Sequence, residues 1–407
     1  MPRIRPRPSA ETIPLPRGFR AAGVRCGIKA SKGLDLALLA SDGPAAVAGV
    51  FTRSTVVGAP VELCRARVPR ASGRAVIVNA GISNVAMGAR GRRAAHAMAR
   101  AAARALGCDE RDVLVASTGV IGQPLPVAKI RAAVPGLVAA LAPGGLGDAA
   151  RAIMTTDTFP KWAHARTRID GRWVQVSGIA KGAGMIEPNM ATMLSFLCTD
   201  AAVAPRTLQA VLREVADQTY NRLTVDGETS TSDTVLLFAN GQAGNATLRG
   251  ARSAGARRLT RALLEVCEEL VRKLARDGEG ATKLVTVRVR GARSPEEADR
   301  AARRIANSML VKTAVFGGDP NWGRILQTVG AGRVRLDPQR AEVRLCGVAV
   351  FRRGASTGPA ARRRAAAGLT RPEVEIAVAL GAGRSAAHMF TCDLGYDYIR
   401  INAEYTT

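Results

Sequence analysis

Short apolar runs alternate with amphipathic stretches along this chain, and the two patterns predict strands and helices. Runs of about four to eight aliphatic or β-branched residues indicate buried strands. We place these at residues 74–78, 112–116, 173–176, 194–197, 235–238, 284–289, 341–345 and 374–380. Apolar and small residues at helical spacing indicate helices, which we place at residues 94–106, 205–220 and 258–276.

Local signals predict a further helix, a turn and two loops. Ser294 and Pro295 open the helix, because serine can cap a helix and proline suits the first helical position, while Glu297 is placed to bond back to the cap. Residues 117–119 (STG) indicate a turn after a strand. The stretches 241–257 and 352–371 are rich in Gly, Ala and Arg, which is typical of loops.

The order of these elements indicates the fold class. Helices do not follow every strand, and several strands alternate apolar with polar residues. We therefore predict an α/β (α+β) fold of layered mixed sheets flanked by helices. At ~100–200 residues per domain, the 407 residues allow more than one domain.

The charge of the chain changes this picture little. The formal net charge is +26, which is a feature of nucleic-acid-binding proteins when the basic residues cluster. Here the arginines are mostly spread out, and only 4% of residues are aromatic, which leaves few side chains for base stacking. We expect no nucleic-acid partner. An arginine-rich binding protein without catalysis remains the alternative, and it predicts salt-sensitive binding to DNA or RNA.

Cysteine usage and hydropathy exclude other classes. The seven cysteines are scattered without a C-x-x-C pair, and the three histidines are isolated, so we expect neither a disulfide framework nor a metal site. No apolar run approaches the ~20 residues of a membrane span. Residues 1–17 are an Arg/Pro-rich stretch without the apolar core of a signal peptide, and we expect a flexible tail. These features predict a cytoplasmic protein with no membrane partner.

The candidate chemistry lies in residues 178–200 (GIAKGAGMIEPNMATMLSFLCTD). Lys181 lies among small residues, but the residue order of a phosphate-binding loop is absent. A threonine hydroxyl needs a base, and one solution is a threonine made N-terminal by chain cleavage, whose own α-amino group accepts the proton. Thr192, preceded by the small residue Ala191, suits this chemistry. The pattern alone also fits a threonine that simply packs in a strand.

Motifs spread over nearly the whole chain resemble those of one family. The segment KGAGMIEPNMATML (residues 181–194) resembles the processing signature of the ornithine acetyltransferase (glutamate N-acetyltransferase) family. Further matching motifs lie, in the same order as in the family, at residues 18–29, 35–41, 116–122, 154–158, 223–234, 277–283, 307–314, 318–324 and 393–407.

The resemblance implies a fold and a processing event. The implied fold is the layered arrangement of self-processing threonine-nucleophile enzymes, with a smaller domain in the β chain. The chain would cut itself between Ala191 and Thr192 by attack of the Thr192 hydroxyl on the preceding carbonyl. An N→O acyl shift and ester hydrolysis would follow. Residues 18–191 would form the α chain and residues 192–407 the β chain.

The resemblance also implies an activity and its residues. Thr192 would take the acetyl group of N-acetylornithine and pass it to glutamate in a double displacement. The oxyanion hole maps to Thr118 and Gly119, where a hydroxyl and a close backbone N–H would stabilise both tetrahedral intermediates. Substrate contacts map to Thr155, Lys181, Thr192, Glu279, Asn402 and Thr407.

The same resemblance implies that the α and β chains assemble as a heterotetramer of two each, without a metal or a bound cofactor. It leaves open whether acetyl-CoA is a second acetyl donor. A role for Thr407, the last residue, requires the tail 393–407 to fold back into the site. A self-processing aminopeptidase-type hydrolase of the same fold is the alternative function.

Three features depart from the pattern that we expect of the family. Residues 79–88 contain Ile82 and Ser83 where polar or small residues are expected, which puts rate or substrate preference in question. Ala183 and Glu187 differ within the processing segment. Glu187 adds a negative charge close to the scissile bond, and this predicts slower cleavage.

Overall fold

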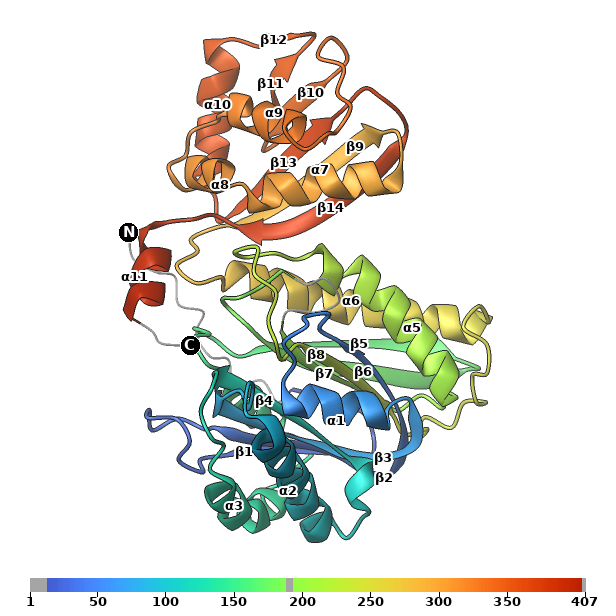
Figure 1. Cartoon of the computed structure of the whole chain (residues 1–407). Helices are drawn as coiled ribbons and strands as arrows, with labels where there is room; N and C mark the ends of the chain where they lie inside the picture. Colours follow the sequence, from blue (N-terminus) through green and yellow to red (C-terminus); the bar gives the residue numbers. More distant parts are fainter. Residues whose placement is uncertain (1–12, 188–192, 405–407) are drawn as a thin grey trace.

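The computed structural model describes residues 13–187 and 193–404, which fold around two β-sheets (Figure 1). The larger sheet has the order β4-β3-β2-β8-β7-β6-β5, and β1 pairs with β2 beside this path. Its strands are β1 (Phe19–Val24), β2 (Leu36–Phe51), β3 (Arg70–Ile82), β4 (Val113–Val120), β5 (Lys161–Ile169), β6 (Arg172–Lys181), β7 (Leu194–Thr199) and β8 (Thr234–Ala239).

The long strand β2 joins the two halves of this sheet. Its residues 36–40 pair with β3, and its residues 46–51 pair with β8. The two halves share a core, in which Phe196 and Phe238 of one half belong with Met98 and Ile130 from the helices of the other. The chain therefore forms four layers here, two of helices outside two of strands (Figure 1).

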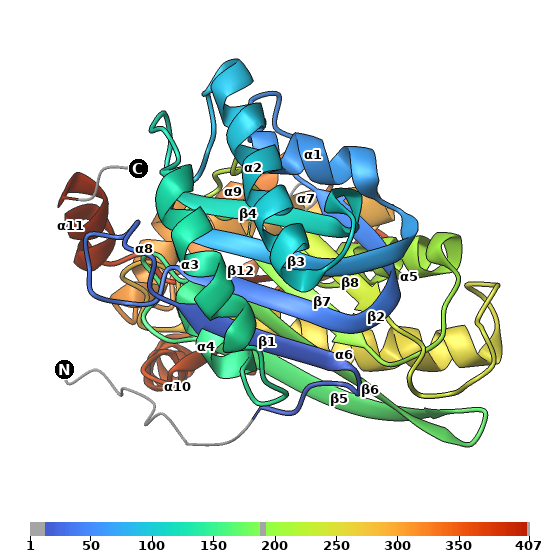
Figure 2. The same ribbon diagram turned by 90° about the horizontal axis from the view of Figure 1, so that it is seen from below.

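The helices of the outer layers lie on opposite sides of the larger sheet. One layer consists of α1 (Ala59–Arg67), α2 (Gly88–Leu106), α3 (Val127–Ala139) and α4 (Leu146–Ala152), seen together in Figure 2. The other consists of α5 (Pro205–Gln218) and α6 (Ala254–Arg276). Short 3-10 turns, η1 (Glu110–Asp112) and η2 (Tyr220–Arg222), precede β4 and follow α5.

The smaller sheet begins after α6 and has the order β12-β11-β10-β13-β9-β14. Its strands are β9 (Leu284–Ala292), β10 (Glu342–Leu345), β11 (Val348–Arg352), β12 (Ala355–Ser356), β13 (Glu373–Ala379) and β14 (Ser385–Cys392). Its helices are α7 (Pro295–Asn307), α8 (Met309–Phe316), α9 (Trp322–Gly330) and α10 (Pro359–Leu369). The last helix, α11 (Tyr396–Glu404), leaves this domain and lies beside the larger one (Figure 1).

The predicted fold class is confirmed. Parallel pairs (β3 with β4, β7 with β8, β9 with β13) occur among antiparallel ones, so both sheets are mixed. Each predicted strand and helix is found, and most extend beyond the predicted limits. Within the described ranges, no helix combines the length and the apolar character needed to cross a bilayer.

Two local predictions are wrong. Residues 117–119 are not a turn, because β4 continues through them to Val120 and keeps its parallel pairing with β3. Residues 352–371 are not a loop, because they contain β12 and the helix α10. That helix has proline at its start and a run of alanines and arginines, which are good helix formers. The sequence-based prediction gave too much weight to the flanking glycines.

The predicted helix start at residue 294 is confirmed, with one change. The Ser294 side chain accepts a hydrogen bond from the Glu297 backbone N–H, as a cap should. The Glu297 carboxylate does not complete the predicted reciprocal bond. It accepts from the backbone N–H of Arg293 at 2.9 Å and pairs with the Arg293 guanidinium instead.

Candidate active site

A pocket lies where β4 and β6 end and where β7 and β8 begin. Thr118, Gly119, Thr155 and Lys181 all line it. Lys181, the last residue of β6, donates from Nζ to Thr155 Oγ1 at 2.8 Å and to Thr118 Oγ1 at 3.1 Å. The two residues expected to form the oxyanion hole and two of those expected to contact substrate therefore meet in one place.

The ammonium of Lys181 has hydroxyl partners and is available to an anion. Burial lowers the pKa of Lys181 below its ordinary value, while the carboxylates of Asp157 and Glu279 oppose that shift. Neither hydroxyl partner carries a charge. A carboxylate that entered the pocket would therefore supply an opposite charge that, within residues 13–187 and 193–404, this half-buried lysine lacks at hydrogen-bond distance.

Gly119 occupies a position that tolerates no side chain. Its φ is +125°, a region that favours glycine, and it pairs with Gly81 across β3 and β4. A Cβ atom at residue 119 would lie 2.2 Å from the Gly81 carbonyl carbon. Glycine is needed here for the strands to approach and for the backbone of β4 to keep this course at the pocket.

A buried charge cluster of Asp157, Lys161 and Asp277 is bonded to the backbone of residues that line the pocket. Lys161 Nζ lies 2.6 Å from Asp157 Oδ1 and 2.5 Å from Asp277 Oδ2, and all three side chains are almost fully buried. Asp157 also accepts from the backbone N–H groups of Thr155 at 3.0 Å and Gly182 at 2.7 Å. Asp157 thereby links Thr155 to the residue that follows Lys181.

Glu279 lies against the segment 182–185. Its backbone N–H donates to Ala183 O at 2.8 Å, and its carboxylate packs against Gly184, where a Cβ atom would lie 2.3 Å from Oε2. Asn402, on α11, donates from Nδ2 to Glu279 Oε2 at 2.9 Å. The C-terminal helix therefore contacts Glu279, another residue that the family resemblance assigns to substrate binding.

Asp233 is a further carboxyl group at the pocket. It lies directly before β8, is 1% exposed, and its Oδ2 has no hydrogen-bond partner within the described part of the chain. Burial raises the pKa of Asp233 well above its usual range, with the nearby Lys181 opposing this. The ionised form of Asp233 is therefore less favoured at this point of the wall than it is in water.

The scissile bond expected at Ala191 and Thr192, and the expected contact at Thr407, lie outside the described residues. Met193, the residue bonded to Thr192, lines the pocket and accepts at its carbonyl from the Thr234 N–H at 3.0 Å. Thr192, the predicted first residue of the β chain, is thus bonded to a residue that lines this pocket.

Residues 79–88, whose sequence differs from the expected family pattern, support the strand that carries Thr118. Ser83 lines the pocket, and its backbone N–H and hydroxyl both donate to Val120 O, at 3.0 and 2.9 Å. Asn79 accepts from the Ser117 hydroxyl at 2.6 Å. These contacts hold β4 in place on both sides of Thr118.

Comparison with known proteins decides the family. The ArgJ family model matches residues 20–407. The chain belongs to the ArgJ family. The arginine biosynthesis bifunctional protein ArgJ of Geobacter sulfurreducens is 47% identical over 391 residues, covering 96% of this chain and 99% of that protein. The protein of the same description from Symbiobacterium thermophilum is 48% identical over 399 residues, covering 97% of this chain and 98% of that protein.

Among solved structures, this ArgJ-family chain is similar to ornithine acetyltransferase complexed with ornithine from Mycobacterium tuberculosis. The two are 40% identical, the match covers 45% of this chain and 97% of that chain, and the TM-score is 0.40. The family resemblance expected from the motifs is confirmed by the family model and the full-length relatives.

Three aspartates at or beside the pocket were not predicted from the sequence, although they lie in the motifs that match the family. Asp157 stands two residues after Thr155, and Asp277 two residues before Glu279. Asp233 lies in LTVDGETSTSDT (residues 223–234). The signal was an aspartate two residues away from Thr155 and from Glu279. In the part of the chain that is described, no group of three or more His, Cys, Asp or Glu side chains is placed to hold a metal ion.

Proposed function

We propose that this ArgJ-family chain is an acetyltransferase of arginine biosynthesis. It transfers the acetyl group of N-acetylornithine to glutamate through an acetyl ester on Thr192. The observation that carries the proposal is the meeting of Thr118, Gly119, Thr155 and Lys181 in one pocket that Met193 also lines. Family membership supports the reaction, and the pocket supports the assignment of the residues.

The reaction begins with processing of the chain. The Thr192 hydroxyl attacks the Ala191 carbonyl carbon, the peptide C–N bond breaks, and the acyl group moves from nitrogen to oxygen. Water then hydrolyses the ester and leaves Thr192 with a free α-amino group. This amino group is the base that the threonine hydroxyl requires, since an α-amino group has an ordinary pKa of ~7.7–8.0.

Acetyl transfer then uses the same hydroxyl twice. Thr192 Oγ attacks the acetyl carbonyl of N-acetylornithine, ornithine leaves with the proton, and acetyl-threonine remains. The glutamate amine attacks the ester, and N-acetylglutamate leaves as Thr192 regains its proton. Thr118 Oγ1 and the Gly119 backbone N–H stabilise the oxyanion in each step, and one such donor is typically worth about 3–4 kcal/mol in the transition state.

The polar groups of the site match the charges of these substrates. We assign Lys181, with Thr155 beside it, to a substrate carboxylate, because among the described residues its ammonium bonds to two uncharged hydroxyl groups, of Thr155 and Thr118. Glu279, held by Asn402, is assigned to the side-chain ammonium of ornithine. Thr407 is assigned to the same substrate contacts on family resemblance.

The proposal extends to a cytoplasmic enzyme without a bound cofactor, assembled from two α and two β chains. Native mass measurement tests the assembly. The use of acetyl-CoA as a second donor is tested by following N-acetylglutamate formation from acetyl-CoA and glutamate.

The deciding experiment is the intact mass of the wild type beside Thr192→Ala. The proposal is supported if the wild type splits into two chains, with Thr192 at the new N-terminus, and the variant stays whole. It is overturned if the wild type and the variant both stay uncut. Acetyl transfer is then followed with and without glutamate. Consumption of N-acetylornithine without glutamate at the same rate would instead identify the self-processing hydrolase.

A further inference from the structure

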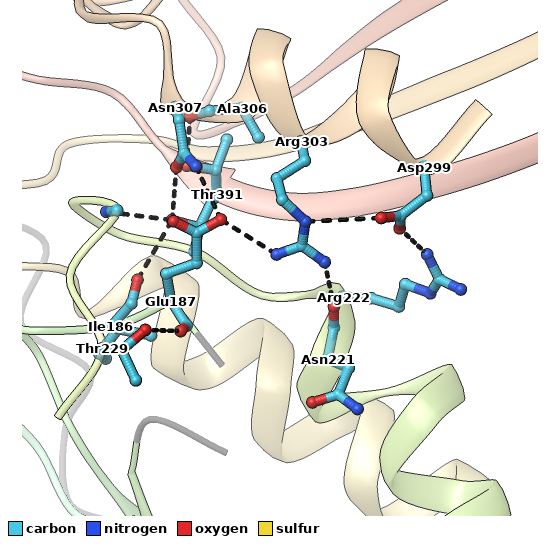
Figure 3. Close-up of polar contacts among 12 residues, drawn as sticks. Ile186, Glu187, Asn221, Arg222, Thr229, Asp299, Arg303, Ala306, Asn307 and Thr391 are labelled. Atoms are coloured by element: carbon cyan, nitrogen blue, oxygen red, sulfur yellow. Dashed lines mark hydrogen bonds and ion pairs between the residues drawn. The ribbon is translucent and has the colours of Figure 1, made fainter. Parts of the chain in front are cut away.

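Glu187 is the last described residue before the expected cleavage site, and its side chain is held by the smaller domain. Its Oε1 lies 3.1 Å from Arg303 Nη1 and accepts from Asn307 Nδ2 at 2.9 Å (Figure 3). Both partners belong to α7. The side chains of Glu187 and Arg303 are only 17% and 27% exposed, which makes this ion pair better shielded than a surface pair.

The partners of Glu187 are themselves fixed to the larger domain. Asn307 Oδ1 accepts from Thr224 Oγ1 at 2.6 Å, so one amide side chain of α7 contacts two segments of the larger domain. Arg303 Nη2 donates at 3.0 Å to the carbonyl of Asn221, which lies in η2 (Figure 3). We name Glu187, Arg303 and Asn307 the α7 clamp.

The backbone around Glu187 is also held. Asp226 accepts from the N–H groups of Met185 at 2.6 Å and Ile186 at 2.8 Å. The Glu187 N–H donates to Glu228 O at 2.8 Å, and the Glu187 carbonyl accepts from Thr229 Oγ1 at 3.0 Å. The backbone of residues 185–187 is therefore firmly held, and the α7 clamp adds two contacts between the Glu187 side chain and α7.

The segment with the expected scissile bond is thus attached to fixed points at both ends. Upstream is Glu187, and downstream is Met193, whose carbonyl is held by the Thr234 N–H at the start of β8. Self-cleavage requires a hydroxyl and the preceding carbonyl carbon to meet in a defined geometry. Such reactions are sensitive to position, since a displacement of about 1 Å can cost about 100-fold in rate.

We propose that the α7 clamp positions the upstream end of the processing segment for self-cleavage, and that afterwards it retains the new α-chain end on the β chain. Glu187 is a positioning residue, since it acts through the backbone that it holds. The inference rests on the proposed function, because it assumes cleavage at Thr192. It reverses the effect expected from the sequence, where Glu187 was an unpaired negative charge that slows cleavage; the structure pairs that charge.

Cleavage kinetics of the full chain test the proposal. The uncut precursor is made by cell-free synthesis, and conversion to two chains is followed by mass spectrometry. We expect Glu187→Ala and Arg303→Ala each to slow cleavage by at least about tenfold. A displacement of the reacting groups by about 1 Å can cost ~100-fold in rate, and this sets the upper end of the expected effect. Glu187→Gln, which can still accept from both donors, should recover most of the rate.

A neighbouring ion pair supplies the matched control. Arg222 pairs with Asp299 of α7, so Arg222→Ala also removes a contact between η2 and α7 but leaves Glu187 untouched (Figure 3). We expect it to cleave at the wild-type rate. Unfolding by urea shows whether a slow variant is folded. If Arg222→Ala slowed cleavage as much as Glu187→Ala, any contact between the domains would have the same effect as the clamp, and the proposal would be overturned.

Two further outcomes separate the proposals. If the wild type never cleaves, the proposed function fails. If the wild type cleaves and Glu187→Ala cleaves equally fast, the function stands and the clamp fails.

Retention of the α chain is tested separately, by native mass spectrometry in rising salt. The cut Glu187→Ala protein should release its α chain at lower salt than the cut wild type does. Release at the same salt would overturn this part of the proposal.

Discussion

Two lysines lie close together on neighbouring strands, and their surroundings differ. Lys161 starts β5 and is fully buried between the carboxylates of Asp157 and Asp277. Lys181 ends β6, whose residue Ala180 pairs with Lys161, and it has two hydroxyl partners at the pocket. The carboxylates raise the pKa of Lys161 against the effect of burial, whereas burial lowers the pKa of Lys181.

The difference separates a lysine that holds the structure from one that is available to a ligand. A buried charge that already has two opposite charges beside it gains little from a substrate. A lysine that lacks such a partner gains much. Removing Lys161 should therefore reduce stability, and removing Lys181 should reduce activity.

The largest expected effect is on folding. Lys161→Met leaves Asp157 and Asp277 buried without their cation, and breaking a buried pair in this way typically costs about 3–5 kcal/mol. Urea unfolding measures the loss. Lys181→Met is the control and should keep wild-type stability. Equal stability of the two variants would remove the distinction between the lysines.

The next effect is on catalysis at the pocket. Thr118→Val keeps the shape of the side chain but removes the hydroxyl that faces Lys181, so kcat for acetyl transfer should fall about 10²–10³-fold. Stability should change little. A variant with wild-type kcat would show that Thr118 has no role in stabilising the oxyanion.

Within the buried charge cluster, the two aspartates should differ. The ion pair with Lys161 and the N–H groups of Thr155 and Gly182 hold the pKa of Asp157 below its usual range, while burial raises that of Asp277. Asp157→Asn should cost about 1.5–3 kcal/mol and Asp277→Asn less, both by urea unfolding at neutral pH.

The pH dependence of stability checks the same ranking. A lowered carboxyl pKa stabilises the fold above the unfolded-state pKa, and the contribution is lost as pH falls through the folded-state value. The stability advantage of wild type over Asp157→Asn should therefore shrink below about pH 4. An advantage that grows on acidification would contradict the assignment.

The smallest effect is a shift of a pH profile. Because burial lowers the pKa of Lys181, its ammonium is lost at a pH below the ordinary 10.5, and the alkaline limb of kcat/KM should lie below that pH. Lys181→Arg keeps its charge to a higher pH, so its limb should move upward even if the rate is lower. If the alkaline limb of kcat/KM stays at the same pH in Lys181→Arg, the limb reports the titration of another group.

The sequence allowed prediction of the strands and helices that carry periodic apolar residues. It did not show that β4 runs through residues 117–119, because Ser-Thr-Gly is common in turns and only the pairing of Gly119 with Gly81 makes a strand of it. It also missed α10, whose alanines and arginines suit both a helix and a solvated loop.

The sequence by itself determined the family, the fold class and the residue types at the site, because these depend on motifs and periodicity that are local in the chain. Only the tertiary structure decided which charges are paired. Lys161 and Asp277 are 116 residues apart, as are Glu187 and Arg303, yet each pair forms an ion contact. The energy of a buried charge depends on its neighbours in space, and sequence separation carries no information about them.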